Sequence, residues 1–131
     1  ATLYFPVSAD GALFGCGDMH AVMGDGEIGV TGAEAAGYAT VTLTALPDLK
    51  IKNPIMENDT HFITIASAET LDEAVDTAVH DMLDILHERT GVGEDQLTML
   101  FSLVGDVRIC QVVDPEKTVR FEMPKYVIEK L

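Results

Sequence analysis

The chain has 131 residues, of which 47% are hydrophobic, and its 22 acidic against 8 basic side chains give a formal net charge of −14. This length suits one ordinary domain with a core, so we expect residues 1–131 to form a single domain. No apolar run approaches the ~18 residues of a membrane helix, and the negative charge repels phosphate backbones, so the composition argues against membrane and nucleic-acid partners.

Two short apolar pieces precede a glycine-rich region. Residues 3–7 are aliphatic, aromatic or β-branched and include Pro6, which is typical of a strand at a sheet edge. This strand-like start without a methionine suggests a fragment or a processed product. A second apolar piece covers residues 12–14. Glycines are then so dense between residues 15 and 37 that we expect a tightly folded loop region there.

A strand pattern follows the glycine-rich region. Residues 38–46 alternate Thr with Val and Leu at period two, which predicts a half-buried strand. Residues 61–66 form a second strand pattern, and residues 47–59 contain the Pro and Asn typical of a loop. We therefore predict that these two strands pair across that loop.

The clearest helix pattern in the chain spans Leu71 to Arg89. Its apolar residues recur at helical spacing along one face. Thr70 and Glu73 have the spacing of a capping box, and Gly91 is a typical helix stop. This stretch is therefore predicted to be one long amphipathic helix.

Shorter patterns cover the rest of the chain. They predict a second helix over residues 94–103, a strand over 107–113 and a helical turn within 124–131. No repeat, low-complexity tract or linker divides the sequence. The order of strands, long helix, short helix and strand favours an α+β fold, with a mostly antiparallel sheet, one long amphipathic helix and a shorter second helix.

The glycine-rich region also gathers side chains that can bind a metal ion. Asp18 and His20 are two residues apart, so in extended backbone both point to one side and can reach a single ion. Asp25 and Glu27 repeat this spacing, and Glu34 follows. A divalent ion in a partly open site lowers the pKa of bound water and polarises a carbonyl, while a carboxylate can act as general base. Such a set would hydrolyse an amide.

These residues also have plainer interpretations. Asp25 before Gly26 is more often a turn than a ligand, and a lone histidine such as His20 is more often a hydrogen-bonded structural residue. The grouping of so many acidic side chains in one segment is costly, however, because like charges repel. The joint occurrence therefore favours a shared cation, without naming the metal.

Cysteine usage and absent motifs narrow the class of protein. Cys16 and Cys110 form no CxxC pair, and the first residues lack the basic and apolar regions of a secretory signal, so we expect a cytoplasmic protein. Cys16 adjoins the candidate site, but a lone cysteine among small residues more often packs than ligates. No Gly-x-Ser-x-Gly elbow, Walker loop, dinucleotide fingerprint or zinc-finger spacing is present.

The motifs resemble those of a known enzyme family. The segment Phe14-Gly-Cys-Gly-Asp-Met-His-Ala-Val-Met-Gly-Asp-Gly-Glu-Ile28 resembles the signature of the acetamidase/formamidase family, in which Gly-Asp-x-His-Ala runs into Gly-Asp-Gly-Glu and a further Glu follows. Residues 5–7, 73–82 and 102–115 are similar to the preceding strand, the following helix and a late segment of that family. Its members are longer, so the resemblance implies that this chain is their C-terminal part and that an N-terminal half supplies further site residues.

The resemblance implies a metal-dependent amidase that hydrolyses short-chain amides, such as formamide and acetamide, to the carboxylate and ammonia. The implied metal is zinc, with calcium as a second possibility, and Asp18, His20 and Asp25 become its ligands. Glu27 becomes a further ligand or the base, and Glu34 would orient water or substrate, so these two are the candidate catalytic residues. The implied partners are the amide, the N-terminal half of the same protein and further copies of the chain in a homo-oligomer.

Two other hypotheses stay open. The acidic loop could hold calcium for structure only in a non-catalytic binding or assembly module, which predicts that chelation lowers thermal stability while no amide is turned over. A free-standing small domain of unrelated function predicts instead a monomer that folds alone.

Overall fold

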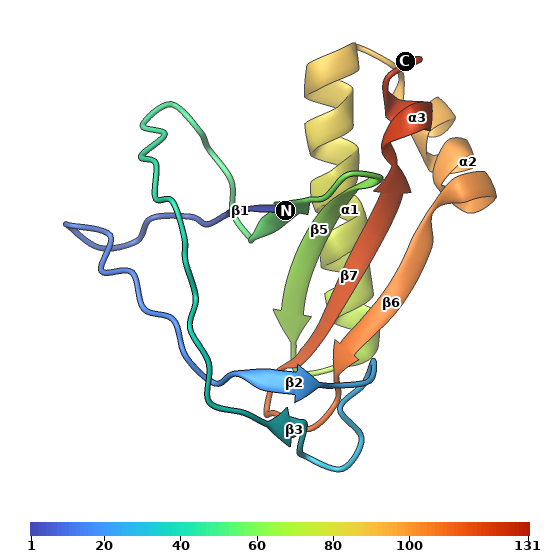
Figure 1. Ribbon diagram of the computed structural model, residues 1–131. Helices are drawn as coiled ribbons and strands as arrows, with labels where there is room; N and C mark the ends of the chain where they lie inside the picture. The colour runs from blue at the N-terminus through green and yellow to red at the C-terminus, as the bar shows by residue number, and fades with distance from the viewer.

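The computed structural model describes residues 1–131 as one sheet flanked by helices, with a long irregular segment beside them (Figure 1). The main sheet has five strands, and each neighbouring pair is antiparallel. Their order in the sheet is β1 (Thr2–Tyr4), β4 (Ile55–Glu57), β5 (His61–Ala68), β7 (Lys117–Pro124) and β6 (Asp106–Gln111). This confirms the expected α+β class.

No helix has both the length and the apolar character to cross a membrane. The other elements are β2 (His20–Val22), β3 (Ala33–Glu34), α1 (Leu71–Thr90), α2 (Glu94–Val104) and α3 (Lys125–Ile128).

Helix α1 confirms the helix prediction at both ends. The Thr70 side chain accepts a hydrogen bond from the Glu73 N–H while the Glu73 carboxylate accepts from Thr70, which completes the capping box. Gly91 ends the helix in the left-handed conformation at φ 72°, which costs glycine little. The buried residues recur every four positions and face the sheet: Ala74, Ala78, Met82 and Leu86.

Strand β7 lies in the interior of the sheet, although the sequence analysis placed no element there. Val119, Phe121 and Met123 are buried in the core that the sheet shares with α1 and α2, while the intervening Arg120 and Glu122 are only partly buried. This period-two alternation is the normal strand signal and was present in the sequence. Strand β7 pairs with β5 on one side and β6 on the other, so it positions both neighbours.

The predicted strand over residues 38–46 is wrong. This segment is irregular, and it carries exposed apolar side chains, with Tyr38 104% and Leu43 64% exposed. A strand requires a partner for its backbone groups, and within this chain β5 pairs with β4 and β7 instead. The alternating pattern therefore has no neighbour here to pair with.

The glycine-rich region is mostly irregular, as expected, but it contains a small second sheet. Strands β2 and β3 pair antiparallel, with His20 opposite Glu34. In Figure 1 this pair crosses the lower ends of the main sheet. Gly26, in the connection between the two strands, forms a parallel bridge with Gln111 at the end of β6. The tertiary structure therefore attaches the candidate site to the sheet.

Candidate metal centre

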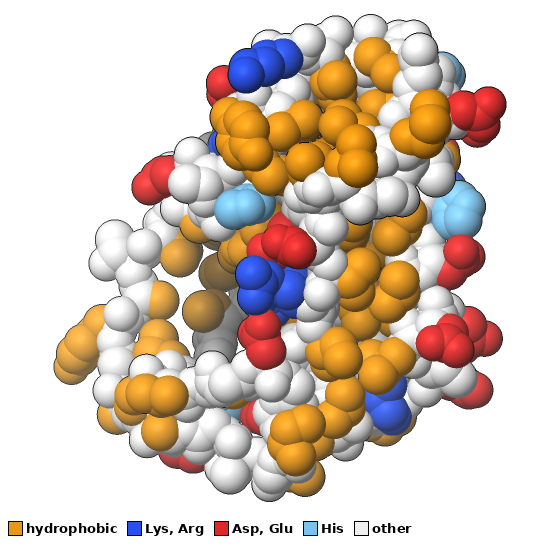
Figure 2. Space-filling model, turned by 90° about the vertical axis from the view of Figure 1, so that its right-hand side faces the viewer, with side chains coloured by type: hydrophobic (Ala, Val, Ile, Leu, Met, Phe, Trp, Pro, Cys, Tyr) orange, Lys and Arg blue, Asp and Glu red, His pale blue; other side chains and the backbone are white.

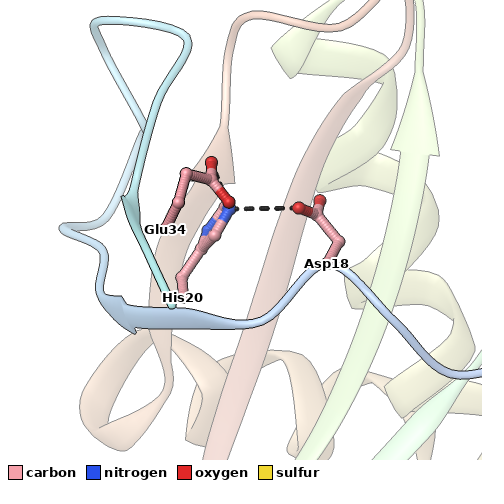
Figure 3. A group of neighbouring side chains, drawn as sticks. All are labelled: Asp18, His20 and Glu34. Carbon is pink, nitrogen blue, oxygen red and sulfur yellow. Dashed lines mark ion pairs between the residues drawn. The ribbon is translucent and has the colours of Figure 1, made fainter. Parts of the chain in front are cut away.

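Asp18, His20 and Glu34 converge on one point (Figure 3). The His20 Nε2 atom lies 3.2 Å from an Asp18 carboxylate oxygen and 3.0 Å from a Glu34 carboxylate oxygen. The histidine side chain is 15% exposed, whereas those of Asp18 and Glu34 are 83% and 65% exposed. The three residues therefore form a cluster with a half-buried imidazole and two carboxylates open to solvent.

Local backbone structure explains this convergence. His20 and Glu34 are a cross-strand pair of β2 and β3, and side chains of directly opposed residues point to the same face. Asp18 precedes β2 and has φ 54°, a left-handed conformation that aspartate tolerates better than most residues. This turn directs its carboxylate back toward the imidazole.

Gly32 makes room for the imidazole. A Cβ atom at this position would lie 2.6 Å from His20 Cγ and would also clash with Nδ1. Any side chain here would push the ring from its place, because separations this short are strongly repulsive. The site therefore requires glycine at position 32.

The donor set fits a divalent metal ion. One atom from each of the three side chains lies within 4.8 Å of the others. Tetrahedral ligands of one zinc ion, bound at about 2.0–2.2 Å, lie roughly 3.3–3.6 Å apart, and the two His20 distances, 3.2 and 3.0 Å, are close to that spacing but slightly shorter. Imidazole nitrogens and carboxylate oxygens both bind zinc, and three protein ligands leave a position open for water or substrate.

Asp25, expected as a third metal ligand, lies elsewhere. Both of its carboxylate oxygens accept hydrogen bonds from Arg120, at 3.1 and 3.0 Å. These bonds lower the pKa of the Asp25 carboxyl, against a smaller opposing effect of burial. Asp25 therefore pairs with a guanidinium and is not a member of the cluster, and its role as a metal ligand stays a prediction.

The two candidate catalytic glutamates are placed differently. Glu34, expected to orient water or substrate, lies beside His20 as a member of the cluster. Glu27 is half-buried, has φ 45° and is not a member. Its backbone, and not its carboxylate, has hydrogen bonds, to Gly24 and Val30. The roles of both glutamates in catalysis stay predictions.

Arg120, which pairs with Asp25 in the glycine-rich region, was not expected from the sequence to have a role near the site. It pairs with both Asp25 and Glu122, and its side chain is 21% exposed. Burial opposes its charged form, but the hydrogen bonds to the two carboxylates outweigh that effect and raise the pKa of Arg120. Recognising the alternation of β7 would have placed Arg120 on a strand, although its distant partner would still have been unknown.

The Asp25–Arg120 pair predicts a pH dependence of stability. Because folding lowers the pKa of Asp25 below 3.8, its contribution is complete above that pH and is lost as the pH falls through the lower folded value. Asp25→Asn should therefore lower the free energy of unfolding near neutral pH, by about 1 kcal/mol or less because the pair is partly exposed. Urea unfolding of both proteins from pH 7 to 3 should show the difference shrinking at the acid end; a difference independent of pH would contradict it.

Comparison with known proteins identifies similar chains. Residues 1–130 match the model of the Acetamidase/Formamidase family. A predicted acetamidase/formamidase from the thermophile Thermoanaerobacter tengcongensis superposes with a TM-score of 0.94 at 45% identity, covering 98% of this chain and 42% of that one. An acetamidase from Bacillus halodurans gives 0.94 at 44% identity, covering 98% and 44%. An acetamidase from Yersinia enterocolitica gives 0.80 at 33%, covering 83% and 33%.

The similarity is extensive but covers only part of each relative. This chain spans less than half the length of the three solved structures. No curated protein matched the sequence.

Proposed function

The chain belongs to the acetamidase/formamidase family, and from this premise we propose that it carries the metal centre of an amidase that hydrolyses short-chain amides. Formamide and acetamide are the proposed substrates, and the carboxylate and ammonia the products. The observation that carries the proposal is the convergence of Asp18, His20 and Glu34 within 4.8 Å. The solved relatives named as acetamidases support the reaction class.

The three side chains have distinct parts in the proposed site. When bound, the metal would supply Lewis acidity, which polarises the amide carbonyl and lowers the pKa of a bound water. His20 offers the Nε2 lone pair when its ring is neutral, and the half-buried position limits its motion. Asp18 and Glu34 offset the positive charge of the ion. Their exposure leaves one side of the cluster open to a small amide.

Zinc is the proposed metal. An imidazole nitrogen suits zinc, whereas calcium takes six to eight oxygen ligands. The cluster offers two carboxylates and one imidazole, which is a poor match to a calcium site. Glu27 stays the candidate general base, because a half-buried carboxylate in the same loop could approach a water at the open side of the site.

We also propose that the rest of a longer family chain packs against the exposed apolar surfaces. Tyr38, Val41 and Leu43 are 104%, 54% and 64% exposed in the segment whose strand pattern finds no partner. Figure 2 shows another apolar area on the face that carries α2 and β6, where Leu103 is 79% exposed and Val107 48%. Large exposed apolar areas commonly mark interfaces. A second copy of this chain in a homo-oligomer is the alternative to the rest of a longer family chain as the partner that covers these surfaces. Sedimentation of the protein with and without the added segment distinguishes the two.

A non-catalytic metal-binding module is the alternative function. The exposure of Asp18 and Glu34 favours it, since carboxylates open to water can hold an ion without an enclosed substrate pocket. In that case the ion would contribute only to stability.

One experiment separates the two functions. We expect the protein mixed with the remaining N-terminal part of a family chain to retain zinc and to release ammonia from acetamide. Chelation should stop ammonia release, and added zinc should restore it, because the metal is required for the reaction. Metal content is measured by elemental analysis and ammonia by a coupled assay, with the chelated mixture as control. Tightly bound metal without ammonia release would favour the binding module, and no bound metal would exclude both.

A further inference from the structure

The loop that joins β2 to β3 is held against the main sheet at its tip. The Gly26 N–H donates to the Cys110 carbonyl at 3.1 Å, and the Gly26 carbonyl accepts from the Val112 N–H at 3.1 Å. Beside it, Asp25 accepts two hydrogen bonds from Arg120, which is 95 residues away in the sequence. Two neighbouring loop residues therefore attach the connection between the ligand-bearing strands to β6 and β7.

Arg120 is itself fixed by the sheet. Its Nε donates to one Glu122 oxygen at 2.6 Å, and the other Glu122 oxygen accepts from Arg108 Nε at 3.1 Å. Glu122 is 12% exposed and Arg120 21%. Strand β7 has a strand on each side, so the sheet and Glu122 hold the Arg120 guanidinium in a defined position. The planar guanidinium donates two parallel hydrogen bonds to a carboxylate, which fixes the orientation of Asp25.

The loop backbone requires such support. Glu27 and Val30 have φ of 45° and 61°, in the left-handed region, which is unfavourable for a β-branched residue such as valine. Strained conformations persist only where the surrounding structure holds them. Strands β2 and β3 pair at only two positions, with a register shift between them. Relaxation of the loop would therefore move the two strands, and the ligands they carry, relative to one another.

We propose that Arg120 is a positioning residue for the metal centre. By binding Asp25 it holds the loop between β2 and β3 in the form in which His20 and Glu34, with Asp18, face one ion. Arg120 does not touch the cluster, so it acts only through the loop. This inference rests on the proposed function, because it assigns Arg120 a purpose in metal binding.

The first test measures zinc affinity by competition with a chromophoric chelator. Arg120→Met and Asp25→Asn should each weaken zinc binding by about tenfold, the lower end of the effect of removing groups that orient metal ligands. The double variant should be no weaker than either single variant, because one interaction is lost in all three. Arg89→Met is the matched control: it removes a guanidinium that lies over the Phe62 ring and does not pair with Asp25 or Glu122, and it should bind zinc as the unsubstituted protein does. The visible spectrum of bound Co²⁺ should change for Arg120→Met and not for Arg89→Met.

The second test needs no metal and separates this proposal from the proposed function. Amide hydrogen exchange of the metal-free protein should speed up within residues 18–34 in Asp25→Asn and Arg120→Met, while α1 keeps its protection. Asp25→Asn alters an exposed side chain and should fold even if Arg120→Met does not.

Unchanged exchange in that loop would overturn the positioning role. If the loop loosens yet the unsubstituted protein binds no zinc, the loop contact stands, but the metal centre and the purpose assigned to Arg120 both fail. Zinc affinity equal in all variants would refute the positioning role and leave the metal centre standing.

Discussion

Replacing His20 with alanine is expected to lower zinc affinity by more than about 100-fold and to abolish amide hydrolysis. Its Nε2 atom is the one atom that lies near both carboxylates, at 3.2 and 3.0 Å. Removing even a group that only orients a metal ligand costs about 10- to 100-fold in affinity, so losing the ligand itself should cost more. Zinc affinity is measured by chelator competition, and ammonia release with the N-terminal part of a family chain present.

His80→Ala is the matched control for this substitution. His80 is an exposed residue of α1 whose ring nitrogen contacts Asp76, and it lies outside the cluster. It should leave zinc affinity and ammonia release unchanged. Zinc content that survives His20→Ala at full stoichiometry would remove His20 from the ligand set, and with it the metal centre proposed above.

Gly32→Ala is expected to weaken zinc binding at least about tenfold while every ligand stays present. The added methyl group would lie 2.6 Å from His20 Cγ, so the imidazole must leave the position in which it faces the two carboxylates. Metal affinity depends strongly on ligand orientation, whereas the core between α1 and the sheet is not involved. The measurement is again zinc competition, with thermal unfolding of the metal-free protein recorded alongside.

Gly29→Ala provides the control within the same loop. A Cβ atom at Gly29 has nothing within 4 Å, so the same chemical change should leave zinc affinity unaltered. Zinc affinity unchanged in both glycine variants would mean that the imidazole position seen here does not matter for binding. A similar loss in both would indicate general loosening of the loop.

The helices were predictable because their signals are local. The capping box of Thr70 and Glu73, the apolar face of α1 and the stop at Gly91 involve residues within a few positions of one another. The same holds for α2, whose observed span of Glu94–Val104 nearly equals the prediction. Strand β7 carried an equally local alternation and could have been found.

The strand prediction at residues 38–46 failed for a different reason. Alternating Thr, Val and Leu residues indicate that a segment can form a strand. Whether it does depends on a partner strand, which can be distant in the sequence. In this chain β5 finds its partners in β4 and β7, and the earlier segment has none.

By itself the sequence determined the α+β class, the two helices, the family resemblance and the segment that holds the candidate ligands, since each follows from residue type and short spacing. Tertiary structure alone decided which acidic side chains share a point. The pairing of β2 and β3 places Glu34 beside His20, and the packing of the loop on the sheet pairs Asp25 with Arg120, 95 residues away. Spacing shows which residues can face one way, whereas contacts between distant segments are set by the packing of the whole chain.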